Sequence, residues 1–258
     1  AENNWLGWTA LGATAALLLA IIVFVVREIA SIWRLRSTSD LRSSIEASLK
    51  SKNSRDINKL TRQLETHFQD QPMTAHGRAT LAENRDEVMD AQDRYALAER
   101  ELLSGLDAEA QKIVANAAKR VSVVTAVSPR AIVDVGYVLY ENVRLIRILC
   151  ELYGGRAGFV GTMSLARSVV AHLAVTGTIA AGEGIIQQLL GHGLAAKLSA
   201  RLGEGVVNGV MTARIGLAAI DVCRPAPFHA LEKPKLSNFI SMLTKLGGDK
   251  KTATNNPD

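Results

Sequence analysis

The stretch WLGWTALGATAALLLAIIVFVV, residues Trp5–Val26, decides the class of this chain because none of its 22 residues is charged. As an α-helix it would be ~33 Å long, which is enough to cross the hydrocarbon core of a bilayer. Trp5 and Trp8 at one end, and Trp33 beyond the other, stand where interfacial anchors stand. The alternative is a core helix of a soluble protein, but such helices usually carry a polar stripe. The stretch therefore predicts a transmembrane helix.

The charges on either side of this segment predict its orientation. Glu2 precedes it, and three arginines follow it closely: Arg27, Arg34 and Arg36. The positive-inside rule then places everything after Arg27 in the cytoplasm. Because the first residue is Ala1 and the first methionine is Met73, we expect a further segment ahead of Ala1. We also expect that segment to hold a first span, which makes Trp5–Val26 the second span of a multi-pass protein.

Composition excludes several classes of protein. Apolar residues make up 48% of the 258 residues, which excludes general disorder, and aromatic residues only 5%, which argues against a porin-like barrel. Two cysteines, Cys150 and Cys223, are too few for a disulfide scaffold or a multi-cysteine metal module. The chain has 30 basic and 25 acidic side chains, and only one acid precedes Arg27, so the part from Arg27 onward carries a charge of +6. This excess favours the anionic inner leaflet, while its interleaving with acids argues against nucleic acid as a partner.

Apolar residues three, four or seven apart predict helices throughout the rest of the chain. The expected helices cover 39–68, 74–103, 107–127, 129–153 and, near the end, 236–246. No segment alternates with a period of two, so no sheet is expected. We predict an all-α protein in which a transmembrane helix precedes a cytoplasmic helical bundle. Its parts are the membrane segment and basic flank (1–36), an amphipathic helical region (37–127), a helical core domain (128–228), and a short helix with a disordered tail (229–258).

Residues 157–222 are almost as apolar as the membrane segment and yet contain charges. Small residues at helical spacing predict a hairpin of closely packed helices; they are Gly177, Ala181, Gly205, Gly209 and Ala213. The charged residues argue against further spans and are candidates for buried ion pairs or a cavity lining; they are Arg167, His172, Glu183, Glu204, Arg214 and Asp221. The region is either a core of the cytoplasmic domain or partly inserted in the membrane interface.

Motifs that carry chemistry are missing from the sequence. There is no P-loop, no HExxH pair and no Cys-His array, and the five histidines do not cluster. Gly203-Glu204-Gly205 followed by Gly209 has the wrong spacing for a dinucleotide fingerprint. Cys223 has no histidine at a spacing typical of a catalytic thiol. We therefore predict no catalytic, cofactor-binding or metal-binding residue, and no enzymatic activity.

Several segments resemble the YcjF family of bacterial inner-membrane proteins, most closely its alphaproteobacterial branch. The residues that carry the resemblance are 128–131 (SPRA), 151–154 (ELYG), 200–209 (ARLGEGVVNG), 212–216 (TARIG) and 220–225 (IDVCRP). The resemblance implies two N-terminal spans, a helical cytoplasmic domain and no assigned activity. The C-terminal domain is similar to a helical domain that is also fused to Era-like GTPases. The family association with a P-loop GTPase of the YcjX type implies such a partner.

Two functional hypotheses follow, and an enzyme is a distant third. The first is an inner-membrane scaffold whose cytoplasmic helices dock a P-loop GTPase, associate with a second copy of the chain as a homo-oligomer, or both. The second is direct membrane shaping or lipid binding, through residues 157–222 or the basic helices after Arg27. The third, an enzyme acting on lipids, would need a polar cluster that faces a cavity.

Overall fold

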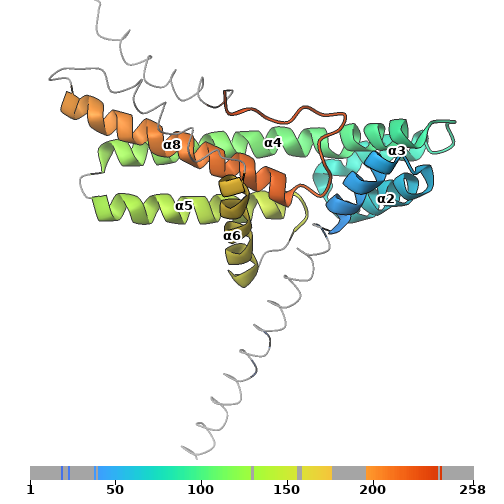
Figure 1. Ribbon diagram of the computed structural model, residues 1–258, viewed down its shortest axis with the longest axis horizontal. Helices are drawn as coiled ribbons and strands as arrows, with labels where there is room; N and C mark the ends of the chain where they lie inside the picture. Colours follow the sequence, from blue (N-terminus) through green and yellow to red (C-terminus); the bar gives the residue numbers. More distant parts are fainter. Residues whose placement is uncertain are drawn as a thin grey trace, which may run out of the picture.

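The computed structural model describes residues 40–128, 131–155, 159–175 and 196–237, together with the single positions Leu19, Val23, Thr38 and Phe239. Throughout these residues the regular structure is helical and contains no strand, so the predicted all-α class is confirmed. The elements, shown in Figure 1, are a helix over residues 40–51, α2 (Ser54–His67), the short 3-10 helix η1 (Pro72–Thr74), α3 (Ala75–Glu83), α4 (Ala91–Val127), α5 (Ala131–Leu152), α6 (Phe159–Val175) and α8 (Ala196–Cys223).

Most of the predicted membrane span, Trp5–Val26, lies outside the described residues. Leu19 and Val23, its two described positions, are helical and exposed. The other predictions that lie outside the described residues are those for Arg27, Trp33, Arg34, Arg36, Gly177, Ala181 and Glu183, and for the tail beyond Phe239.

The long helix α4 is the axis of the bundle. Its 37 residues correspond to a rod ~55 Å long. α5 and α8 pack along the part of α4 that leads into α5 (Figure 1). α2 and α3 pack against the opposite end of α4. The buried apolar side chains of α4, which include Leu102, Leu106 and Val114, form a continuous core with those of the neighbouring helices.

α8 approaches α4 closely because glycine stands at the contact. A side chain at Gly205 would overlap the main-chain oxygen of Ser122, and one at Gly209 would overlap the hydroxyl of Ser122. Ala213, one turn further along α8, is completely buried. Small residues four apart therefore lie on the face of α8 that meets α4, as close helix packing requires.

Within the described residues, one helix is long and apolar enough to cross a membrane, and it is part of α8. Its segment Gly203–Cys223 has a mean hydropathy of 1.5, but 61% of that window is buried inside the bundle. α8 contacts α4, α5 and α6. A helix that is apolar on most sides is expected where neighbours surround it, so this segment of α8 packs in the core of the bundle, beside α4, α5 and α6.

The predicted boundaries around residue 104 were wrong. The structure has no single helix over 74–103: α3 ends at Glu83, a turn follows, and Val88 is fully exposed in the irregular segment between that turn and α4. α4 then runs without a break through Gly105 to Val127. Asp107, where the expected helix 107–127 begins, instead lies inside α4 and accepts hydrogen bonds from side chains of other elements. A charged side chain with such partners is stable inside a helix, so it gave a false start signal.

A turn divides the expected helix 39–68 into two helices, so that prediction was wrong, and a second turn follows the end of α5. The chain turns between residues 40–51 and α2 at Lys52, whose φ is +54°, and the side chain of Asn53 caps α2 by accepting a hydrogen bond from the amide of Arg55 at 3.2 Å. α5 ends just before Gly154, whose φ is +86°. Glycine adopts that left-handed conformation without steric cost, which is why helices commonly end there.

Candidate functional site

A buried arginine lies at the centre of the charged groups in the bundle. Arg224 follows the last residue of α8, and neither its side chain nor that of Glu99 is exposed to solvent. Its Nη2 lies 3.0 Å from Oε1 of Glu99 and 3.0 Å from Oδ2 of Asp107, both on α4. We call Arg224, Glu99 and Asp107 the Arg224 clamp.

The Arg224 clamp holds the segment after α8 against α4. Nη1 of Arg224 donates to the carbonyl oxygens of Ala226 and Pro227, at 2.6 and 2.8 Å, and its guanidinium lies 4.0 Å from the ring centroid of Phe228. Glu99 accepts from the main-chain amides of His229 and Ala230. Every charge in the clamp is thus paired and hydrogen-bonded, which is the condition under which buried charges are tolerated.

Asp107 also ties α5 to the clamp. The hydroxyl of Tyr153 donates to Oδ1 of Asp107 at 2.7 Å. Burial of the phenol and the nearby Asp107 carboxylate raise the pKa of Tyr153 well above its usual range. Burial and the charge of Glu99 likewise raise the pKa of Tyr95, whose hydroxyl donates to the carbonyl of Pro227. Both phenols therefore stay protonated at neutral pH and act as hydrogen-bond donors.

A second ionic cluster is centred on Asp221, near the end of α8. Its buried carboxylate contacts Arg42 from helix 40–51 at 3.5 Å, His172 from α6 at 3.3 Å, and Lys233 from the segment after α8. Arg42 also donates to the main-chain oxygen of Asp221. One carboxylate thus joins three elements that are far apart in the sequence, which fixes the first described helix on the bundle.

Of the remaining candidate residues that the structure describes in 157–222, one is buried and two are exposed. Arg214 is buried in α8. Arg167 and Glu204 were candidates for buried ion pairs or a cavity lining; both are exposed, so neither is part of a buried ion pair. α6 buries Leu165 and Val169, and Arg167 lies midway between them, which turns it to the opposite side of the helix.

The sequence interpretation missed all three residues of the Arg224 clamp. Glu99 follows Tyr95 by four residues and precedes Leu102 by three, which places a carboxylate on the apolar face of a helix. A charge on that face needs a buried partner, and this was the available signal. Nothing in the sequence pattern indicated that the partner would be Arg224, 125 residues further on.

Cys223 is a buried structural residue. Its thiol interacts with that of Cys150, and both cysteines are free and buried. The hydrogen bond with Cys150, together with burial, raises the pKa of the Cys223 thiol well above its usual value. A thiol held in the protonated form is a poor nucleophile. In the described part of the chain, no group of three or more His, Cys, Asp or Glu side chains is placed to hold a metal ion.

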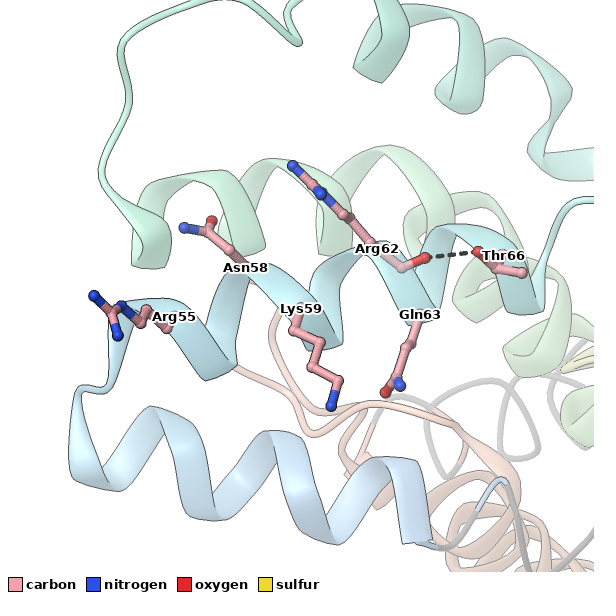
Figure 2. Close-up of a pocket in the computed structure, with 6 residues that line it drawn as sticks. All are labelled: Arg55, Asn58, Lys59, Arg62, Gln63 and Thr66. Atoms are coloured by element: carbon pink, nitrogen blue, oxygen red, sulfur yellow. Dashed lines mark hydrogen bonds between the residues drawn. The ribbon is translucent and has the colours of Figure 1, made fainter.

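A basic depression lies on the exposed face of α2. It has a volume of about 490 Å³, and Figure 2 shows its lining side chains, which all come from this one helix: Arg55, Asn58, Lys59, Arg62, Gln63 and Thr66. Three of the six are cations at a spacing of three or four residues, which places them on one side of the helix. Ile57 and Leu64 on the opposite side are buried. We call this surface the α2 basic face.

Comparisons with known proteins match this sequence to proteins that are named as membrane proteins. The family described as a domain of unknown function, DUF697, matches residues 89–247, a range that includes the whole Arg224 clamp. A UPF0283 membrane protein of Rhizobium etli is 53% identical over 241 residues, which cover 93% of this chain and 67% of the relative. UPF0283 membrane proteins of Brucella canis and Sinorhizobium medicae are 51% and 50% identical, and each alignment covers 97% of this chain and 70% of the relative. No solved structure matches the chain.

Proposed function

The chain belongs to the DUF697 family and to the UPF0283 membrane proteins, and on that premise we propose that it is a non-catalytic scaffold that holds a P-loop GTPase at the bacterial inner membrane. The observation that carries the proposal is the contrast between the two sets of charges. The charges of the Arg224 clamp are buried and paired with one another, whereas the cations of the α2 basic face are exposed to solvent.

The internal charges have structural roles that account for their presence. Glu99 and Asp107 hold Arg224, and Asp221 joins three elements. The buried phenols and the Cys223 thiol are held in their protonated forms. General acid–base or nucleophilic catalysis needs groups whose pKa lies near the working pH and which reach a substrate. These groups instead stabilise one arrangement of helices, as a scaffold requires.

The α2 basic face has the chemistry of a surface that binds an acidic partner. Arg55, Lys59 and Arg62 form no ion pair with any described residue. The neighbouring Asp56 is bonded to Asn53 at 2.6 Å. Complementary charge of this kind speeds association and selects partners more than it adds raw affinity. We therefore propose that the GTPase contacts this face through acidic side chains.

The test measures binding of the purified GTPase to the full chain in lipid nanodiscs, with GDP and with a GTP analogue. The triple variant Arg55→Glu, Lys59→Glu, Arg62→Glu should weaken binding at least tenfold, as about 1.4 kcal/mol or more of lost complementarity predicts. The matched control reverses three exposed bases elsewhere: Arg100→Glu, Lys112→Glu and Lys235→Glu. It changes the net charge by the same amount and should leave the affinity within about twofold.

Two results would contradict the proposal. Equal losses in both triple variants would show that overall charge, rather than the α2 basic face, governs the contact. Absence of binding by the unmodified chain with either nucleotide would remove the GTPase as a partner.

A further inference from the structure

The end of the bundle where α4 passes into α5 exposes a concentration of large apolar side chains. Their exposed fractions range from 53% at Val123 to 74% at Val127. The set consists of Val123, Val127, Val133, Val135, Leu139 and Tyr140. We call these six residues the apolar tip. In Figure 1 it lies at the left end of the molecule, opposite α2 and α3.

The polar groups beside the apolar tip are fixed in place by internal bonds. Thr125 donates to Asp134 at 2.6 Å, and Asn208 donates to the other oxygen of the same carboxylate at 3.4 Å. These contacts join α4, α5 and α8 immediately beneath the tip. The apolar side chains are therefore held outward by a bonded framework.

Basic residues surround the base of the tip. Residues 119–147 contain five basic and two acidic residues. The acids are Asp134, which is bonded as above, and Glu141, which is 2% exposed and paired with Arg120 and Arg144. Lys119, Arg120, Arg144 and Arg147 are all exposed. Arg147 is balanced by Glu151 on the same helix, at 2.9 Å. The excess of positive charge at the base of the tip therefore comes from Lys119, Arg120 and Arg144, which outnumber Glu141, the carboxylate that the two arginines share.

Polarity along the exposed face of α5 is sorted by distance from the tip. Val133, Tyr140, Arg144 and Arg147 follow one another at intervals of seven, four and three residues, so they share one face of the helix. Arg144 lies one turn, ~6 Å, beyond Tyr140 along the axis. On a helix that packs against another protein, apolar and polar side chains lie on different sides, in stripes parallel to the helix axis. Sorting along the axis instead matches the layers of a bilayer, where an apolar region lies beneath an aromatic belt and charged headgroups.

We propose that the apolar tip inserts into the interface of an anionic bilayer and that the basic residues around it bind lipid phosphates. Because the chain is already associated with a membrane, the tip meets lipid at a high effective concentration. A weak intrinsic affinity of the tip for lipid is therefore sufficient. The tip contact is independent of the GTPase proposal because it uses the opposite end of the bundle. A second copy of the chain is the alternative occupant of the same surface.

The test places a polarity-sensitive fluorophore on the tip of the full chain. Leu139→Cys is labelled with a nitrobenzoxadiazole group, since both native cysteines are buried, and the protein is reconstituted into vesicles of phosphatidylcholine with or without phosphatidylglycerol. Val88→Cys is the matched control, because Val88 is a large apolar residue that is fully exposed at the other end of α4. Quenching is measured with nitroxide-labelled lipid and with aqueous iodide.

We expect the label at 139 to shift its emission to the blue and to be quenched by the lipid-borne nitroxide, more strongly when phosphatidylglycerol is present. The label at 88 should be quenched by iodide alone. Lys119→Gln and Arg147→Gln should each lower the ratio of inserted to exposed tip by about fivefold, the usual effect of one basic residue near an anionic surface.

Two outcomes would overturn the proposal. If the label at 139 behaves like the label at 88 in anionic vesicles, the tip does not contact lipid. If the label is shielded to an extent that depends on the number of protein molecules per vesicle and not on phosphatidylglycerol, a second copy covers the tip instead.

Discussion

Replacing Arg224 by methionine gives the sharpest prediction from the structure. The substitution keeps much of the length of the side chain but removes its charge and all of its donors. Glu99 and Asp107 would then remain buried without the cation that neutralises them. Removing one partner from a buried ion pair costs about 3–5 kcal/mol. We expect Arg224→Met to lose about this much, which is a large part of the ~5–15 kcal/mol that stabilises an ordinary domain.

The loss is measured as the midpoint of thermal unfolding in detergent micelles, followed by circular dichroism. For a domain of this size ~1 kcal/mol corresponds to a shift of ~2–4 °C, so Arg224→Met should lower the midpoint by ~6–20 °C. The control is Arg147→Met, which removes an exposed arginine whose partner is Glu151 on the same helix. Its effect should not exceed ~0.5 kcal/mol.

Hydrogen exchange tests the local part of the argument. The amides of His229 and Ala230 donate to Glu99, so they should lose protection in Arg224→Met before the rest of α8 does. Adding Glu99→Gln to Arg224→Met should recover part of the stability because it removes one of the two unpaired charges. A midpoint within about 1 kcal/mol of the unmodified protein, with unchanged protection of both amides, would refute the reasoning.

Three further predictions concern the core. Gly205→Ala should destabilise the fold by about 1–3 kcal/mol in urea unfolding because its side chain would overlap α4, whereas Gly105→Ala, with no atom in its way, should stabilise it by about 0.5–1 kcal/mol. Cys150 and Cys223 should resist a thiol reagent at pH 8 until the protein unfolds, and rapid labelling of native protein would contradict the burial of both. The free energy of unfolding should fall as the pH rises above ~10, because a buried tyrosine ionises there only in the unfolded chain. Since the pKa of Tyr153 is raised in the fold, Tyr153→Phe should make this fall shallower. An unchanged slope would show that Tyr153 does not contribute to the pH dependence.

Helical periodicity was sufficient to predict the fold class but not where every helix ends. The apolar positions Ile57, Leu60 and Leu64 are buried in α2 as their spacing requires. Val88 lies within the helix expected over 74–103 and yet is fully exposed in the segment that joins α3 to α4. Periodicity records which residues could share a face, whereas only the tertiary packing decides which of them are covered.

The ionic clusters show a second limit of sequence reasoning. Asp221 and His172 were both candidates for buried ion pairs, and the structure brings them within 3.3 Å. Glu99 and Arg224 were not candidates, although they form the more buried pair. Residues 125 positions apart meet only because α8 returns along α4, and no local pattern encodes that return.

The length of α4 bears on how the two proposed contacts coexist. The α2 basic face and the apolar tip stand near opposite ends of a helix of 37 residues (Figure 1), a span of ~55 Å. At physiological ionic strength charges are screened within ~8 Å, so neither contact feels the electric field of the other. The α2 basic face can therefore bind a protein while the apolar tip is inserted in lipid. The length of α4 then sets the distance between the bound protein and the membrane contact.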